Sequence, residues 1–324
     1  MTESPIVSSC ILNGDGTSEN VDENHLVEAL KDDRPAWVHL DGNNSETRAW
    51  LNNNVSYLDP LILNGLLAQE TRPRLSETNE GSLIILRGVN LNEGADPTDM
   101  IAVRLWVDKH RIITIRRRPL KAITDIRERF ETGEGPKTTG EFVVQLSQRL
   151  FERMEPILLE LDDKIDMIEQ KILDNPDPSE RQEIVEVRKD AILYRRYIAP
   201  QKEVMNALRL SEQKWIDPNQ KRHVQEALDR ITRYVEDLDA MRERAQVIKD
   251  ELANMLSDRL NKNLYILSVI SAIFLPLGFF TGLMGINIGG MPGVENDNAF
   301  WIFSGILIVI VACQMIIFKK LKWF

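Results

Sequence analysis

Residues 264–284 read LYILSVISAIFLPLGFFTGLM, and residues 299–318 read AFWIFSGILIVIVACQMIIF. Neither segment contains Asp, Glu, Lys or Arg. A helix needs about 20 mainly apolar residues to cross the hydrocarbon core of a bilayer, and both segments reach that length. Only a short connection, 285–298, separates them. The sequence therefore predicts a soluble part followed by a transmembrane hairpin, 263–324, with two buried core helices as the alternative.

The charges beside the hairpin predict its orientation. Arg259 and Lys262 precede the first span and lysines follow the second, whereas the connection carries Glu295 and Asp297 without Lys or Arg. Because basic residues stay on the cytoplasmic side, both termini are expected in the cytoplasm. The N-terminal residues lack the basic and apolar regions of a signal peptide. These features predict a multi-pass protein of the cell inner (plasma) membrane.

Residues 1–135 have the pattern of a cytoplasmic α/β domain. Short apolar stretches are bounded by Gly, Asn and Asp, as is typical of strands. The strands that this pattern predicts are 5–14, 36–42, 82–91, 100–107 and 111–118, and the predicted helices are 46–54 and 57–69. Gly133, Gly135 and Pro136 mark the end of this domain.

Residues 140–262 have the pattern of a long-helix stalk. Apolar residues recur every three or four positions from Phe142 to Ile172, with one step of seven, and predict a single helix there. A second helix is expected to end near Leu210. A third, 219–283, is expected to be roughly 95 Å long and to continue into the first span. Its apolar stripe fits either a contact within a bundle or self-association around an axis.

One face of the first span is interpreted as the wall of a pore. Its residues step by three and four and are mainly Leu or small: Leu264, Leu267, Ser271, Leu275, Gly278 and Gly282. Rings of Leu can gate a pore by dewetting. Small residues also permit close packing of membrane helices, which is the alternative interpretation. Pro276 deprives the Ala272 carbonyl of its helical donor and is expected to bend the helix.

The outer end of the first span carries the candidate for ion selection, Gly285, Ile286 and Asn287. If several chains meet there, the Asn287 side chains form a ring of amide oxygens that accept hydrogen bonds from the water shell of a cation. Such a ring suits ions that lose water reluctantly, such as Mg²⁺. Glu295 and Asp297 would concentrate cations at this entrance. Helix capping is the alternative role of Asn287.

These residues resemble a known family. Residues 274–293, FLPLGFFTGLMGINIGGMPG, follow a long helix and precede a second span. They resemble the CorA superfamily of divalent-cation transporters, in which a Gly-Met-Asn triplet ends the first span. Ile286 in place of Met is similar to the ZntB branch, which is linked to zinc, and TRPR (71–74) and RRYIAPQ (195–201) also look like that branch. The resemblance implies a homopentameric funnel of CorA-like fold whose pore is lined by the first span.

The resemblance also implies a cargo and a direction. It implies uptake of Zn²⁺, coupled to protons by the precedent of the ZntB branch, with Mg²⁺, Co²⁺, Ni²⁺ and Cd²⁺ as further candidate ions. Because a Met is replaced at the filter, a magnesium, cobalt or nickel channel of the CorA type is one alternative. A membrane-tethered cytosolic sensor or scaffold without a pore is the alternative from a different class.

Other features argue against other classes of protein. The net charge of −10 disfavours a nucleic-acid partner, although ordinary solubility explains it equally well. No P-loop, dinucleotide-binding turn or nucleophile elbow occurs, so neither an enzyme nor a permanently bound cofactor is expected. The four histidines lie far apart in the sequence and predict no preformed zinc site. His39 and Asp41 are interpreted as a polar pair at the end of a strand.

Overall fold

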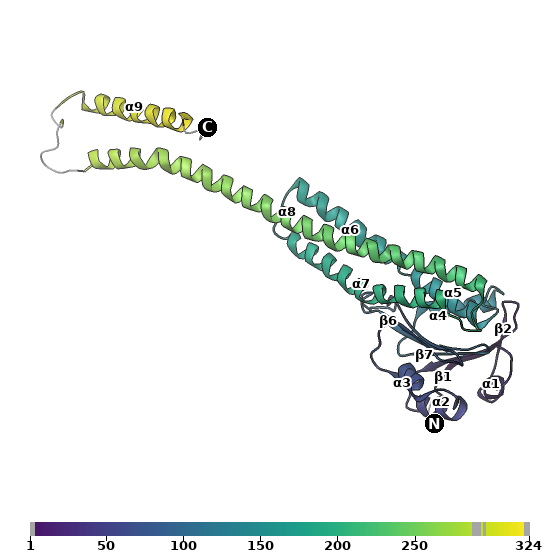
Figure 1. The fold of residues 1–324 in the computed structure, drawn as a ribbon. Helices are drawn as coiled ribbons and strands as arrows, with labels where there is room; N and C mark the ends of the chain where they lie inside the picture. Colours follow the sequence, from purple (N-terminus) through teal and green to yellow (C-terminus); the bar gives the residue numbers. More distant parts are fainter. Residues whose placement is uncertain (1–3, 287–292, 294–295, 321–324) are drawn as a thin grey trace. The chain divides into compact units, whose positions relative to one another are not determined.

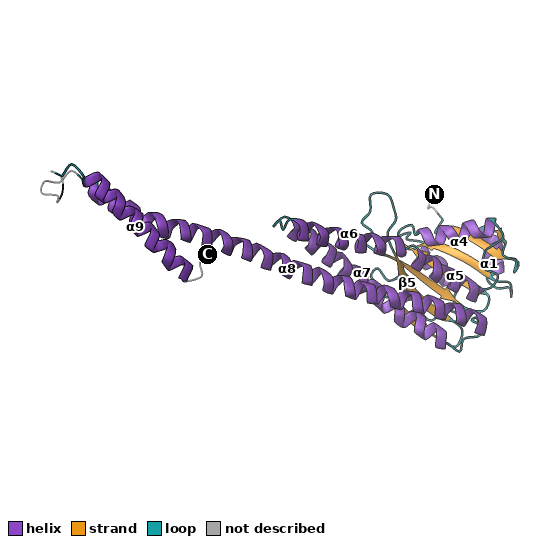
Figure 2. Cartoon of the chain, turned by 90° about the horizontal axis from the view of Figure 1, so that it is seen from above, coloured by secondary structure: helices purple, strands orange, loops and turns teal. Residues whose placement is uncertain are grey.

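The computed structural model of the chain describes residues 4–286, 293 and 296–320. Contacts between residues divide the chain into two compact units, Met1–Asp250 and Glu251–Phe324. The first unit consists of a β-sheet with helices on both faces and of long helices that follow the sheet in the sequence (Figures 1 and 2). The division into 1–135, 140–262 and 263–324 stays a prediction.

The sheet of the first unit has seven strands in the order β2-β1-β3-β7-β6-β5-β4. The strands are β1 (Ile6–Leu12), β2 (Ser18–Asn20), β3 (Ala36–Asp41), β4 (Arg74–Glu77), β5 (Ser82–Gly88), β6 (Ile101–Val107) and β7 (Arg111–Arg116). Strands β3 and β7 run parallel, and the other neighbouring pairs are antiparallel. The five strands expected from the sequence are therefore confirmed, and β2 and β4 are additional edge strands.

Helices cover both faces of this sheet because successive side chains of a strand point to opposite sides. The covering helices are α1 (Glu23–Ala29), α2 (Thr47–Asn54), α3 (Pro60–Leu67), α4 (Lys121–Glu131) and α5 (Thr139–Glu152). On one face, Val38 and Leu40 belong to a buried core that includes residues of α1, α2 and α3. On the other face, the Trp37 ring lies 6.3 Å from the ring of Phe130 in α4 and 4.9 Å from that of Phe142 in α5.

His39 shares the α4–α5 face of β3 with Trp37 and is only 3% exposed. Its Nδ1 lies 2.8 Å from Oγ1 of Thr114 on β7, and the same hydroxyl accepts a hydrogen bond of 2.8 Å from Nε1 of Trp37. The polar partner of His39 is therefore Thr114 rather than Asp41. Burial, together with the nearby positive charges of Arg116 and Arg127, lowers the pKa of His39 to about 3.

Three long helices follow the sheet: α6 (Glu155–Asp174), α7 (Glu180–Leu210) and α8 (Pro218–Met284). The expected helices toward Leu210 and over 219–283 are confirmed. The single helix expected from Phe142 to Ile172 is wrong, because α5 ends at Glu152 and α6 begins at Glu155. Pro156 explains the break, since a residue without an N–H fits the first turn of a helix and not its interior.

Arg244 joins α8 to α6 within the first unit. Its Nη1 lies 2.6 Å from a carboxylate oxygen of Asp166 and 3.9 Å from one of Asp162. Its Nε also donates to the Glu169 carboxylate over 3.0 Å. One guanidinium thus lies beside three carboxylates on the same face of α6, and its contacts with Glu169 and Asp166 raise the pKa of Arg244 further.

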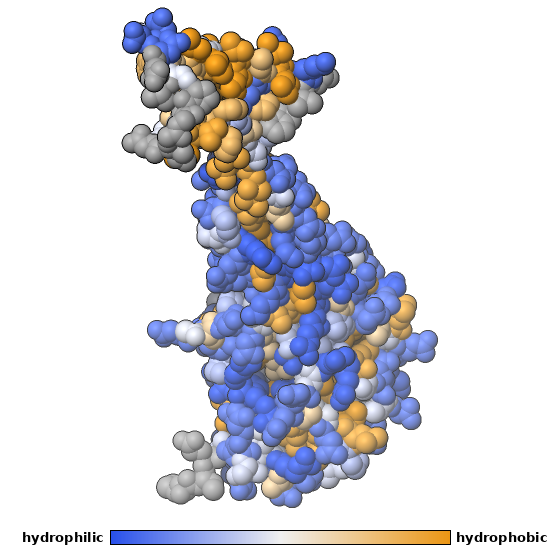
Figure 3. All heavy atoms as spheres, turned by 90° about the vertical axis from the view of Figure 1, so that its left-hand side faces the viewer, coloured by the Kyte–Doolittle hydropathy of each residue, from blue (hydrophilic) through white to orange (hydrophobic). Residues whose placement is uncertain are grey.

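The second unit consists of the rest of α8 and of α9 (Ala299–Lys320). Both helices contain stretches that are long and apolar enough to cross a membrane. Large apolar side chains on them are exposed, for example Phe274 (66%), Leu275 (77%) and Ile308 (69%). Figure 3 shows this hydrophobic surface, whereas most of the visible surface of the first unit is hydrophilic. Core helices of a soluble protein would bury these side chains, so the membrane interpretation explains the surface better.

Candidate functional site

The six residues that were interpreted as a pore wall lie on one face of α8. Leu264, Leu267, Ser271, Leu275, Gly278 and Gly282 are all exposed. The more buried residues of the same segment lie on another face: Val269, Ala272, Ile273, Pro276 and Leu277. At about 100° per residue, the mean directions of the two faces differ by roughly 160°. The predicted pore face therefore lies opposite the buried face of α8.

Helix α9 covers that buried face. Its own more buried residues repeat with a helical period: Phe303, Ser304, Leu307, Ile310, Val311, Gln314 and Phe318. A direct hydrogen bond between Gln314 and Ala272 fixes the two faces against each other. Within the hairpin, α9 thus packs against one face of α8. The opposite face, with its Leu, Ser and Gly residues, has no partner among this chain's described residues.

The small residues of the exposed face do not serve packing between α8 and α9. A Cβ atom built at Gly278 or Gly282 meets no other atom within 4 Å. Ser271, Leu275 and Gly278 instead line a shallow, largely apolar groove together with neighbouring side chains such as Phe274. If these glycines have a packing role, it is toward another molecule or toward a passage.

The outer end of α8 is described only in part. Gly285 follows the last residue of the helix, and its N–H donates to the carbonyl four residues earlier over 3.0 Å. Ile286 is exposed. Asn287 and Glu295 lie outside the described residues. Asp297 is exposed in the turn that precedes α9. The structure therefore leaves the filter residues as a prediction.

Comparison with known proteins decides the family. The sequence model of the family described as "CorA-like Mg2+ transporter protein" matches residues 32–320. The chain belongs to this family.

Similar CorA-family members cover almost the whole chain. The divalent cation transporter CmaX of Pseudomonas aeruginosa is 34% identical over 324 residues, which span 99% of this chain and 97% of CmaX. The zinc transport protein ZntB of Pectobacterium carotovorum is 33% identical over 312 residues, which span 96% of this chain and 94% of ZntB.

Solved structures give the same result. The structure of full-length CmaX matches with a TM-score of 0.85 at 34% identity and covers 98% of each chain. The complete structure of the CorA magnesium transporter from Methanocaldococcus jannaschii matches with a TM-score of 0.80 at 18% identity, covering 98% of this chain and 99% of that one, and supports the fold alone. The expected CorA-like fold is confirmed: an α/β domain, a long-helix stalk and two C-terminal apolar helices.

The two segments that resemble ZntB, 71–74 and 195–201, meet at Arg87 of β5. Its Nη2 donates to the Thr71 carbonyl over 2.8 Å, and its guanidinium lies 4.3 Å from the centre of the Tyr197 ring. The backbone N–H of Arg87 donates to Oε1 of the buried Gln201 over 2.9 Å. Burial lowers the pKa of Arg87. These CorA-family segments therefore join the sheet to α7, a role that the sequence alone did not reveal.

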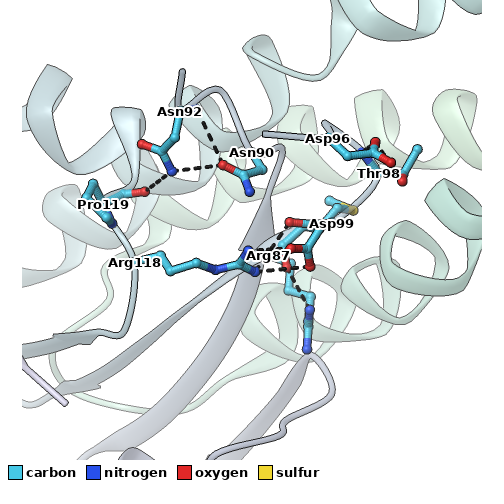
Figure 4. A network of polar contacts seen from close by, with 9 residues as sticks. Arg87, Asn90, Asn92, Asp96, Thr98, Asp99, Arg118 and Pro119 are labelled. Carbon is cyan, nitrogen blue, oxygen red and sulfur yellow. Dashed lines mark hydrogen bonds and ion pairs between the residues drawn. The ribbon is translucent and has the colours of Figure 1, made fainter. Parts of the chain in front are cut away.

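The connection between β5 and β6 is held beside Arg87 (Figure 4). Nη2 of Arg118 donates to Oδ1 of Asp99 over 3.1 Å, and this contact lowers the pKa of the Asp99 carboxyl. Nδ2 of Asn92 donates to Oδ1 of Asn90 over 2.8 Å and to the Pro119 carbonyl over 3.1 Å. These bonds tie the connection to the segment that follows β7.

Within the part of the chain that the structure describes, no group of three or more His, Cys, Asp or Glu side chains is arranged to hold a metal ion. Gln314 is a polar residue that the sequence interpretation missed. It is the one amide or charged side chain in 299–318. That isolation was a readable signal, because strong polar groups are rare in membrane spans and usually have a specific partner.

Proposed function

We propose that the chain carries divalent cations into the cell, as a homopentamer in the inner membrane. The observation that carries this proposal is the exposed face of α8, which lies opposite the face covered by α9. Five such faces around an axis would enclose a passage. The names of the relatives support the cargo, because CmaX is a divalent cation transporter and ZntB a zinc transport protein.

The proposed passage has an apolar throat and a polar mouth. Leu264, Leu267 and Leu275 would form narrow rings that exclude water when the passage is closed. At the outer mouth, five Asn287 amides would accept hydrogen bonds from the water shell of the ion. The cation therefore keeps much of its hydration while it enters, which lowers the cost of leaving bulk water.

The membrane potential supplies a driving force for uptake. A unit charge that crosses the membrane down a potential of about 100 mV gains about 2.3 kcal/mol. A divalent cation therefore gains about 4.6 kcal/mol at that potential. That energy corresponds to an accumulation of roughly two-thousandfold. Proton coupling, which the ZntB precedent implies, would add to this force. Residues 263–294 and 298–318 contain no Asp or Glu that could relay protons through the spans.

Zinc is the proposed principal cargo, and Mg²⁺, Co²⁺, Ni²⁺ and Cd²⁺ are the competitors. Ile286 replaces the Met of the CorA triplet, so the mouth loses a thioether and gains a branched apolar side chain.

The proposed orientation places both termini in the cytoplasm. A cysteine at the exposed Asn296 should react with an impermeant thiol reagent on intact cells, whereas one at the exposed Glu212 should not. The reverse labelling would contradict this orientation.

Ion flux into proteoliposomes tests the function. Purified protein is reconstituted and an inside-negative potential is imposed. Uptake of Zn²⁺, Mg²⁺, Co²⁺ and Ni²⁺ is then compared with that of protein-free liposomes, with and without a pH gradient. We expect Zn²⁺ uptake that rises with the potential and exceeds Mg²⁺ uptake. If none of these four ions enters, the transporter proposal is wrong, and the hypothesis of a membrane-tethered sensor or scaffold explains the chain better.

A further inference from the structure

Pro276 creates an unsatisfied backbone group in the middle of the first span. A helical carbonyl normally accepts from the N–H four residues later, and proline has none, so the Ala272 carbonyl lacks its usual donor. Water cannot replace that donor within the hydrocarbon core of a bilayer. Some other group must therefore satisfy this carbonyl if the segment crosses the membrane.

Gln314 of α9 supplies the missing donor. Its Nε2 donates to the Ala272 carbonyl oxygen over 3.2 Å. Two other side-chain bonds in this segment, from Ser268 to the Leu264 carbonyl (2.8 Å) and from Thr281 to the Leu277 carbonyl (2.9 Å), stay within α8. The bond from Gln314 joins the second span to the first, at the carbonyl that Pro276 leaves free.

The amide of Gln314 is enclosed. Its Oε1 is buried and has no hydrogen-bond partner among the described residues. Val269 and Phe318, each about one turn from the bond on its own helix, are both 8% exposed. Burying an amide oxygen without a hydrogen-bond partner destabilises the fold. The hydrogen bond that the Gln314 N–H donates to the Ala272 carbonyl offsets this cost.

We propose that Gln314 is a positioning residue that holds α8 in one conformation at Pro276, where the helical hydrogen bonding is interrupted, and thereby aligns the two halves of the predicted pore face. This inference rests on the proposed transport function. Leu264 and Leu267 lie before the break, whereas Gly278 and Gly282 lie after it. A change in the helix conformation at Pro276 would therefore move the inner Leu rings relative to the outer, glycine-lined part of the passage.

A double-mutant cycle with Pro276 tests this role. Gln314→Leu keeps the size of the side chain and removes the donor, and it should change Zn²⁺ flux by about threefold or more, the effect of a typical hydrogen bond between membrane helices. Pro276→Ala restores the N–H that bonds Ala272. In that background Gln314→Leu should change flux by less than about twofold, because the carbonyl no longer needs Gln314. Met315→Leu, an exposed neighbour on α9, is the matched control and should match the parent.

A conservative variant gives a second readout that mere packing would not produce. Gln314→Glu can donate to the Ala272 carbonyl only while its carboxyl is protonated. Its flux relative to the parent protein, measured from about pH 5 to about pH 9, should therefore fall as the carboxyl ionises. Gln314→Leu should show no such change relative to the parent.

A measurement without transport separates this inference from the proposed function. Amide hydrogen exchange of residues 273–280 in the purified, metal-free protein should be faster in Gln314→Leu than in the parent and nearly parental in Met315→Leu. If the parent carries no cation but this exchange difference appears, the proposed transport function is wrong and the positioning role of Gln314 is supported. If Gln314→Leu has the same effect with and without Pro276, or leaves exchange unchanged, the inference is wrong.

Discussion

At the scale of single residues, Asn287 carries the proposed selectivity. In the proposed passage its amide would lie between the outer mouth and the apolar throat, and Ala cannot hydrogen-bond the water shell of an ion. Each lost hydrogen bond costs about 1–3 kcal/mol, so Asn287→Ala should reduce Zn²⁺ flux at least tenfold. Flux into proteoliposomes checks this, with Asn254→Ala, an exposed amide of α8, as the control. Parental flux in Asn287→Ala would remove this residue from the filter.

His39 makes the stability of the α/β domain depend on pH. Its pKa is about 3 in the folded chain against an ordinary value of 6.5, so the unfolded chain binds the proton first as the pH falls. Stability is therefore fully present above about pH 6.5 and should fall by about 2 kcal/mol by pH 5. Thermal unfolding at several pH values should show this slope in the parent and in the exposed control His25→Gln, and a smaller slope in His39→Gln. Equal slopes in all three proteins would contradict the assignment.

At the scale of elements, long periodic segments were predictable and short edge segments were not. The spans and α8 follow from composition and from an uninterrupted helical period. Strand β2 has three mainly polar residues, Ser18–Asn20, and exists because it pairs with β1, a tertiary contact that local sequence does not report. The break between α5 and α6 was readable, because Pro156 coincides with the step of seven in the apolar pattern.

The candidate site divides in the same way. The exposed face of α8 was predictable, because a helical period fixes which residues share a face. The bond between Gln314 and Ala272 could not be predicted. It depends on how α8 and α9 align along their lengths, and the sequence of their connection does not determine this alignment. The role of Arg87 was hidden for a related reason, since its partners Thr71 and Gln201 lie far from it in the sequence.

Arg244 should stabilise the contact between α6 and α8 by offsetting part of the repulsion among three carboxylates. Because the guanidinium is more than a third exposed, solvent screens it, and we expect Arg244→Leu to destabilise the first unit by only about 1 kcal/mol. Thermal unfolding in detergent checks this. Added salt should narrow the difference from the parent, because screening weakens the repulsion among Asp162, Asp166 and Glu169. Lys249→Leu, on the same helix, is the control, and an equal loss in both variants would contradict the role of Arg244.

At the scale of the whole molecule, the proposed passage requires several copies of the chain. One hairpin leaves the pore face of α8 open, and a ring of five would close it. Native mass spectrometry in detergent should therefore show a complex of five times the chain mass of 37.2 kDa. The same complex should persist in Asn287→Ala, because the predicted filter is not part of the stalk. A monomer or dimer as the main species would exclude a passage built from five α8 helices.

Accessibility of the two faces of α8 during transport tests the central claim most directly. Ser271→Cys places a thiol on the pore face, and Ile273→Cys places one on the face covered by α9, both in a protein whose native Cys10 and Cys313 are replaced by Ser. A water-soluble, cationic thiol reagent should block Zn²⁺ flux through Ser271→Cys and leave flux through Ile273→Cys unchanged. Block of Ile273→Cys with free passage through Ser271→Cys would show that cations do not follow this face of α8.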